Sequence, residues 1–219
     1  MIHKYGSKRV LRPFSQSLTA CIHPSYSYAR NRHFLTGLLN QIQQPRLQEY
    51  REQRIIGYSQ HQMHALVSDI DHYNEYVPWC TASRTLYRSP SVSATHTLTA
   101  ELQVGFQAFS ESYISTVTVT SPTSVRAVAS DSAMFKTLIN EWKFIPISQL
   151  HPHASKSSLS SDERSCIVDF YVAFEFRNAI YAQASKLFLD EVSKSMVTAF
   201  ADRARVVYGS PARASIKLS

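Results

Sequence analysis

The chain of 219 residues is long enough for one domain of moderate size and a tail, and two full domains would be cramped. Its formal net charge is +7, but seven of the 23 Lys and Arg residues precede Glu49, the first acidic residue. The other 16 basic residues are balanced by 16 acidic ones. This balance argues against a basic surface for nucleic-acid phosphates on the folded part, so nucleic acid is not an expected partner.

The first 45 residues lack acidic residues and carry Ser, Arg and Lys around apolar residues such as Val10, Leu11 and Phe14. This composition is typical of a mitochondrial transit peptide, and the alternative is a disordered basic tail. No long apolar core follows the charges, which argues against a secretory signal. No run approaches the roughly 18 consecutive apolar residues of a transmembrane helix.

The cysteines and histidines suggest neither disulfides nor metal. Apart from Cys21 in the N-terminal region, Cys80 and Cys166 lie far apart and have no ligand neighbours at useful spacing. His151 and His153 form an H-P-H sequence without further ligands nearby. We therefore expect no metal and no cofactor.

Organised structure is expected from about residue 46. Residues 50–59 read as a strand, after which Ser59 and Gln62 form a capping-box pattern at the start of a helix. A second short helical turn is expected over 72–76, and Pro78 prevents its continuation. The first helix carries an apolar stripe at helical spacing, formed by Met63, Leu66, Val67 and Ile70.

After Trp79 the apolar period changes from that of a helix to two, which predicts antiparallel strands with one face in water. The expected strands are THTLTAELQVGF, ESYISTVTVTSP, TSVRAVAS, NEWKFIPI and CIVDFYVAFEF. Between the last two, residues 148–165 are too polar to pack and read as a long hairpin loop.

A helix of about thirty residues follows, with Asn178 as its expected N-cap and Gly209 and Pro211 as its stop. At 1.5 Å per residue it would be roughly 45 Å long, enough to cross a whole sheet. The order of elements predicts an α+β helix-grip fold, in which a curved antiparallel sheet wraps around the long C-terminal helix. The domain is expected over 46–209, with a disordered tail over 210–219.

Six segments in this order together resemble the mitochondrial coenzyme Q-binding proteins of the START and polyketide-cyclase superfamily. They are YVPWC (76–80), AELQVGF (100–106), SESYISTV (110–117), WKFIP (142–146), DFYVAFEF (169–176) and LFLDEVSKSMVTAF (187–200). The resemblance covers about residues 50–209, and the loop 148–165 looks expanded relative to the family pattern.

This resemblance implies a START-like fold with an apolar tunnel that binds ubiquinone and related prenyl-quinone lipids. It also implies a ubiquinone chaperone for ubiquinone biosynthesis and respiratory electron transport, located at the matrix side of the inner mitochondrial membrane. Peripheral contact with that membrane, and association with the ubiquinone biosynthetic complex, are the expected interactions.

The inward strand positions argue against catalysis. Glu101, Glu141, Asp169 and Glu175 fall in the opposite phase of their strands, so no carboxylate is expected inside, although general acid–base chemistry needs one or an equivalent group. Glu111 is the exception, since it shares a face with Tyr113 near the start of its strand. Either residue could hydrogen-bond a quinone head. A one-residue slip of register would reverse these assignments.

The EYVPWC segment places Pro78 and Trp79 at an expected tunnel entrance, where Trp suits a boundary between apolar and wet surroundings. The alternative is that Trp79 only seals the end of the fold. Cys80 reads as a structural thiol, and Lys186 and Lys194 could meet anionic phospholipid. The expected lipid-lining residues are Pro78, Trp79, Leu102, Val104, Phe106, Tyr113, Trp142, Phe144, Phe174, Leu187, Phe188 and Val192.

Three functions stay open at this level. A lipid-binding chaperone is favoured by the apolar inward face. A polyketide cyclase or aromatase-like enzyme would need an acid–base group inside the fold. A non-binding assembly factor of the biosynthetic complex would need an exposed apolar patch instead.

Overall fold

The computed structural model describes residues 46–218 except 91–92, 107–108, 148–163 and 179–184, and the side chains of 106, 109, 185, 186, 192 and 193 are also not described. The described residues all belong to one compact unit, 41–219. The predictions for the N-terminal 45 residues, for His151 and His153, and for most of the loop 148–165 fall outside them.

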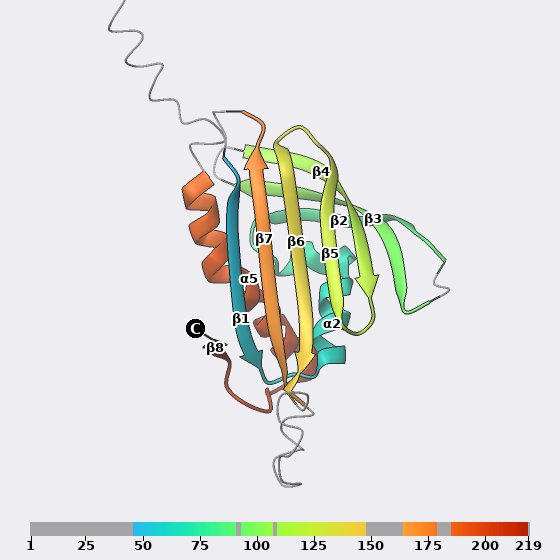
Figure 1. The fold of residues 1–219 in the computed structure, drawn as a ribbon, viewed down its shortest axis with the longest axis vertical. Helices are drawn as coiled ribbons and strands as arrows, with labels where there is room; N and C mark the ends of the chain where they lie inside the picture. The colour runs from blue at the N-terminus through green and yellow to red at the C-terminus, as the bar shows by residue number, and fades with distance from the viewer. Residues whose placement is uncertain (1–45, 91–92, 107–108, 148–163, 179–184, 219) are drawn as a thin grey trace, which may run out of the picture. The chain divides into compact units, whose positions relative to one another are not determined.

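A single antiparallel sheet of eight strands forms the body of this unit, in the order β2-β3-β4-β5-β6-β7-β1-β8 (Figure 1). Together with the C-terminal helix, the curved sheet confirms the predicted helix-grip α+β class. The strands are β1 (Gln48–Ile56), β2 (Cys80–Arg88), β3 (Thr95–Phe106), β4 (Phe109–Thr120), β5 (Ser124–Ser132), β6 (Phe135–Pro146), β7 (Cys166–Phe176) and β8 (Ile216–Leu218).

Two of the predicted strands have the observed bounds, because apolar residues alternate along them. The segments expected as strands over 95–106 and 166–176 coincide with β3 and β7. Strand β2 was missed, because it is an edge strand whose residues after Cys80 are exposed or half-buried, so that its apolar residues do not alternate.

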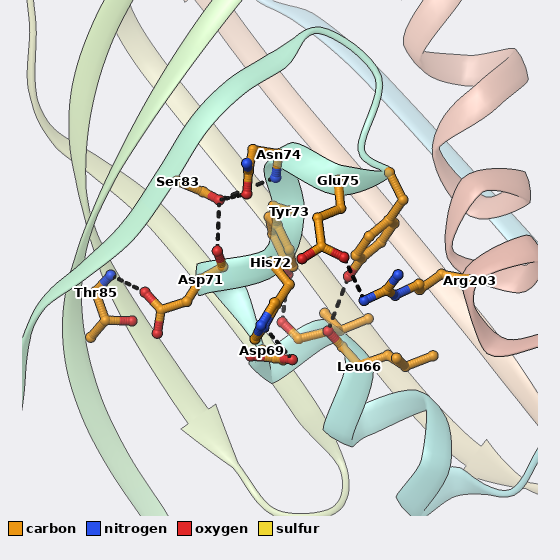
Figure 2. Close-up of polar contacts among 12 residues, drawn as sticks. Leu66, Asp69, Asp71, His72, Tyr73, Asn74, Glu75, Ser83, Thr85 and Arg203 are labelled. Atoms are coloured by element: carbon orange, nitrogen blue, oxygen red, sulfur yellow. Dashed lines mark hydrogen bonds and ion pairs between the residues drawn. The ribbon is translucent and has the colours of Figure 1, made fainter. Parts of the chain in front are cut away.

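Two helical segments precede β2. Helix α2 (Gln60–Ser68) begins at the predicted capping box, in which Ser59 accepts from the Gln62 amide while the Gln62 side chain accepts from the Ser59 amide. The predicted second turn is the 3₁₀ helix η1 (Ile70–Glu75). It connects α2 to the edge of the sheet through the turn at 76–80 (Figure 2).

The last helix, α5 (Ser185–Tyr208), lies on the same side of the sheet as α2 (Figure 1). One of its core contacts is Phe200, whose ring lies 4.6 Å from that of Trp142 on β6. The helix ends as predicted at Gly209, which has a φ of 81° and donates its amide to the Arg205 carbonyl at 3.0 Å. Whether Asn178 caps its start falls outside the described residues.

The tail after α5 differs from the expectation of disorder over 210–219. Strand β8 pairs with β1, and the Ala212 amide donates to the Gly57 carbonyl at 2.8 Å. A Cβ at Gly57 would lie only 2.5 Å from the Arg213 carbonyl oxygen, so the close passage of the tail requires glycine there. The tail is ordered because it supplies hydrogen bonds to the otherwise open edge of β1.

Candidate ligand-binding cavity

A cavity of about 110 Å³ lies between the inner face of the sheet and the covering segments η1 and α5. An engineered cavity of about 150 Å³ binds benzene, so this cavity accommodates on the order of one small ring. In the same conformation it is too small for a ring with a long isoprenoid tail.

The cavity exists because small side chains occupy the middle of the inner face. Ala127 on β5 pairs with Val117 of β4 and with Asn140 of β6. The buried Ser115 lies two residues before Val117 on β4, on the same face of the strand. Larger side chains would fill this space, since protein interiors otherwise pack at the density of organic crystals. All four residues line the cavity.

Aromatic rings close the space on either side of these small residues. The Trp142 and Phe200 rings lie 4.6 Å apart at one end, and the Trp79 and Phe188 rings lie 6.0 Å apart at the other. Of the residues predicted to line a lipid site, seven contribute to the cavity wall, namely Pro78, Trp79, Leu102, Val104, Tyr113, Trp142 and Phe188.

Three of the predicted residues do not line it. Phe144 is fully buried beside the His64 ring under α2, and Phe174 is fully buried against Phe188, at 5.1 Å between ring centroids. Leu187 is 53% exposed. Consecutive helix residues point about 100° apart, so Leu187 cannot share the inward direction of its neighbour Phe188. The structure does not describe the side chains of the other two predicted residues, Phe106 and Val192.

The VPWC segment forms a tight turn at the cavity wall. The Cys80 amide donates to the Val77 carbonyl at 3.2 Å, with Pro78 and Trp79 between them. Trp79 has a φ of 61°, so the segment has the form of a type II turn, in which the third position normally takes glycine. A residue with a Cβ there costs roughly 1–2 kcal/mol. Such strain is typical of functional positions.

The segment η1 covers the cavity and is held from two sides (Figure 2). The Tyr73 hydroxyl donates to the Val67 carbonyl at 2.5 Å, and the Tyr73 and Tyr76 rings lie 5.3 and 5.2 Å from Phe200 of α5. Arg203 of α5 pairs with the Glu75 carboxylate at 2.8 Å and lies 5.1 Å from the Tyr76 ring. These contacts connect the cover directly to the long helix.

The titratable groups of the cavity wall are all poor bases at neutral pH. Burial raises the pKa of the Tyr113 and Tyr73 phenols and of the Cys80 thiol, so each stays protonated. Cys80 is also buried, which agrees with the structural role predicted for its thiol. Among the described wall residues there is no carboxylate, imidazole, ammonium or guanidinium. Glu111 is half-buried on β4 opposite Val104 and lies outside the wall.

The outward phase of the four strand carboxylates is confirmed by their partners. Glu101 pairs with Arg84, Glu141 with Lys143, and Glu175 with Lys136, each on the same or the adjacent strand. Asp169 is only 5% exposed because Arg51 covers it, and the hydrogen bond from Arg51 holds the pKa of Asp169 below its usual value. These charges lie on the face of the sheet that faces away from the cavity.

Sequence reasoning missed two sets of inner-face polar residues. Ser115 lies two residues from Tyr113, and Asn140 two residues from Trp142, so strand alternation could have placed both on the inner face. The other set is on β1, where Glu52 is 3% exposed and pairs with Arg54 at 2.5 Å beneath α5. Glu52 also accepts from Tyr50 at 2.6 Å, Lys217 of β8 lies 3.9 Å away, and Arg54 donates to Thr198 at 3.1 Å.

In the part of the chain that the structure describes, no three His, Cys, Asp or Glu side chains come together as a metal site. None of the helices described there is long and apolar enough to cross a bilayer.

Sequence comparison identifies relatives over most of the chain. Residues 56–201 match the family "Polyketide cyclase / dehydrase and lipid transport". The coenzyme Q-binding protein COQ10 homolog B of Xenopus laevis is 36% identical over 173 residues, which is 78% of this chain and 64% of that protein. The Drosophila melanogaster COQ10 protein is 31% identical over 74% of this chain and 60% of its own length. The chain thus spans less than two thirds of these relatives.

A bacterial relative and two solved structures extend the comparison. The ribosome association toxin RatA of Escherichia coli K12 is 30% identical over 81% of this chain and 98% of its own. The solution structure of CC1736 from Caulobacter crescentus matches with a TM-score of 0.56 and 26% identity, covering 74% of this chain and 99% of its own. The Zhui aromatase/cyclase of a Streptomyces species, at 10% identity and a TM-score of 0.54 over 76% of this chain and 99% of its own, shares the fold. The chain belongs to the polyketide cyclase/dehydrase and lipid transport family, and within it is related to the mitochondrial coenzyme Q-binding proteins.

Proposed function

We propose that the protein binds ubiquinone in the cavity beneath η1 and α5 and acts as a carrier of that lipid. The observation that supports this most is the chemistry of the cavity wall, which is largely apolar and contains no charged side chain among the described residues. An uncharged lipid suits such a wall, whereas an anionic head group would be left without a partner. The names of the two COQ10 relatives point to the same ligand.

A carrier role agrees better with the site than catalysis does. A cyclase or aromatase must move protons, which requires a group whose pKa is near the working pH. The phenols and the thiol in the wall have raised pKa values and remain protonated. We therefore propose that the protein is not an enzyme, although it shares its fold with an aromatase/cyclase.

The thermodynamics favour exchange with a membrane over permanent storage. Burying on the order of 400 Å² of an isoprenoid tail gains roughly 10 kcal/mol relative to water at about 25 cal/mol per Å². The bilayer is equally apolar, so most of this gain cancels. We propose peripheral contact with the matrix side of the inner mitochondrial membrane, where the protein would supply ubiquinone to the respiratory chain and support its biosynthetic complex.

Ribosome association, which the RatA name suggests, is the second candidate. Binding to ribosomal RNA would require a basic surface, yet the basic and acidic residues after Gln48 are equal in number. Co-sedimentation with mitochondrial ribosomes at physiological salt distinguishes the two functions, and we expect none.

The direct test is mass spectrometry of the organic extract from protein purified from its own mitochondria. We expect near-stoichiometric ubiquinone with the wild type, much less with Phe188→Ala, and an unchanged amount with Leu187→Ala. The two substitutions are adjacent on α5, but only Phe188 lines the cavity. Circular dichroism must show that each variant is folded. An empty extract from folded wild-type protein would contradict the proposal.

A further inference from the structure

Besides the phenols of Tyr73 and Tyr113 and the Cys80 thiol, the cavity wall contains one aliphatic hydroxyl and one carboxamide, those of Ser115 and Asn140. The Ser115 residue is 2% exposed, and both Ser115 and Asn140 line the cavity. Neither side chain makes a hydrogen bond to the side chain or backbone of another described residue. Neither Ser115 nor Asn140 holds a fully buried polar atom without a partner, so their polar atoms open onto the cavity, where a bound molecule can hydrogen-bond them.

The sheet register places these two groups on opposite sides of a small-residue floor. Ser115 lies on β4 opposite Ala129 of β5, and Asn140 lies on β6 opposite Ala127 of β5. Strands are about 4.8 Å apart, so roughly 10 Å separates β4 from β6 across the alanines. A flat ring can lie over the Ala127 position with polar atoms at two of its edges reaching Ser115 and Asn140.

The chemistry of the pair restricts the ligand. A hydroxyl and a carboxamide can both donate and accept hydrogen bonds, and neither carries charge. They therefore match a ring that bears carbonyl groups and equally its reduced form with hydroxyl groups. An acyl carboxylate or a phosphate would require a cation, and the described wall contains none.

We propose that Ser115 and Asn140 form a subsite for the two-electron redox pair of a quinone ring, which enters the cavity head first and leaves its tail towards the Trp79 and Phe188 end. This inference rests on the proposed ubiquinone binding, and it replaces the expectation that Tyr113 or Glu111 holds the head. Because both groups can exchange donor and acceptor roles, the oxidised and reduced ring bind with similar affinity.

The test is equilibrium binding of a short-tailed ubiquinone analogue and of a ring-free isoprenoid hydrocarbon to full-length protein. We expect Ser115→Ala and Asn140→Leu each to weaken quinone binding about tenfold, as for loss of one or two buried hydrogen bonds, and to leave hydrocarbon binding unchanged. Tyr113→Phe is expected to bind both as the wild type does. The analogue in its quinol form should bind within about threefold of the quinone.

A stability measurement separates this role from a structural one. Since the Ser115 hydroxyl has no partner to lose, the ligand-free Ser115→Ala variant should unfold at the same or a higher urea concentration than the wild type. If the wild type binds the hydrocarbon but no quinone, the proposed ubiquinone binding itself fails. If it binds quinone, and the two variants bind quinone equally well or lose both ligands alike, the subsite is overturned while the carrier function stands.

Discussion

Trp79 occupies the one positive-φ position that a described residue other than glycine holds. At positions with ordinary backbone angles, a protein with alanine is more stable than the same protein with glycine, because glycine loses more backbone entropy on folding. At a φ of 61° the order should reverse. We expect Trp79→Gly to be about 1 kcal/mol more stable than Trp79→Ala in urea denaturation, with both variants losing quinone affinity.

The matched control is Val77, the first residue of the same turn, which has no positive φ. There Val77→Ala should be more stable than Val77→Gly. If the alanine variant were the more stable at both positions, Trp79 would not be strained. The sequence shows that Trp79 follows Pro78, but it does not show that Trp79 takes the turn position that favours glycine. The backbone strain at Trp79 could therefore not be predicted from the sequence.

His64 gives the protein a pH dependence. The imidazole is 7% exposed, its Nε2 atom has no partner among the described residues, and its ring lies 5.9 Å from that of Phe144. Burial, assisted by His61 and His96, lowers the pKa of His64 below its usual value of 6.5. The unfolded chain therefore binds a proton more readily than the folded one, and stability decreases as pH falls through 6.5 towards the folded pKa.

We expect the urea midpoint to decrease between pH 7 and 5.5, and to decrease less in His64→Gln. His72 acts in the opposite direction, because Asp69 raises its pKa, so both proteins should carry His72→Gln. The pKa of Asp169 is lowered from 3.8, which places its titration below this window. An equal loss of stability in both proteins would show that His64 is not responsible.

At the scale of elements, η1 depends on α5 for its position. Arg203→Leu removes both the Glu75 ion pair and the contact with the Tyr76 ring, while keeping an apolar stem. Partly exposed pairs contribute at most about 1 kcal/mol, so global stability should change little. Hydrogen exchange of the amides in 70–79 should nevertheless become about tenfold faster. Lys194→Leu, an exposed charge on the same helix, should leave it unchanged.

The inner face of β1 supports a second prediction at this scale. Glu52→Leu leaves Arg54 beneath α5 without its partner, and we expect a loss of about 3–5 kcal/mol. The double variant Glu52→Leu/Arg54→Leu should recover much of this loss, since only the exposed Lys217 then lacks its carboxylate partner. Urea denaturation measures both. The outer pair offers a comparison, because Glu101→Leu, beside the exposed Arg84, should cost under about 1 kcal/mol.

At the scale of the whole domain, the cavity of about 110 Å³ is too small for a long-tailed quinone. Accommodation of the tail therefore requires α5 to move away from the sheet. Spin labels at exposed Lys194 on α5 and Arg126 on β5 report this distance, in a background with Cys21→Ser. The remaining thiols are buried and should not react, since burial raises the pKa of Cys166 to about 12 and that of Cys80 as well.

We expect double electron–electron resonance to show a longer distance between the two spin labels when a long-tailed quinone is bound. A ring-only quinone should leave the distance unchanged, since it fits the space already present. Equal distances with both ligands would mean that the tail stays outside the domain, on the membrane or in solvent.

Local patterns predicted the elements that have strong local causes. The capping box at Ser59, the stop at Gly209, and the strands over 95–106 and 166–176 follow from side-chain chemistry and from alternation, which act over a few residues. Strand β2 and the tail strand β8 could not be predicted, because edge pairing depends on which backbone groups distant segments leave open. The burial of Glu52 could not be predicted either. Its partner Arg54 lies on the same strand, but α5, which is far away in the sequence, covers it.

The amino-acid sequence by itself determined which strand residues face inward, where α2 begins and α5 ends, and which family the chain resembles. Only the tertiary structure decided that the inward face is hollow around Ser115, Ala127 and Asn140, and that Phe144, Phe174 and Leu187 lie away from the hollow. Alternation is a property of the local backbone, so it can be read along the chain. A cavity depends on the distance between a curved sheet and its helix, which the packing of residues far apart in the sequence determines.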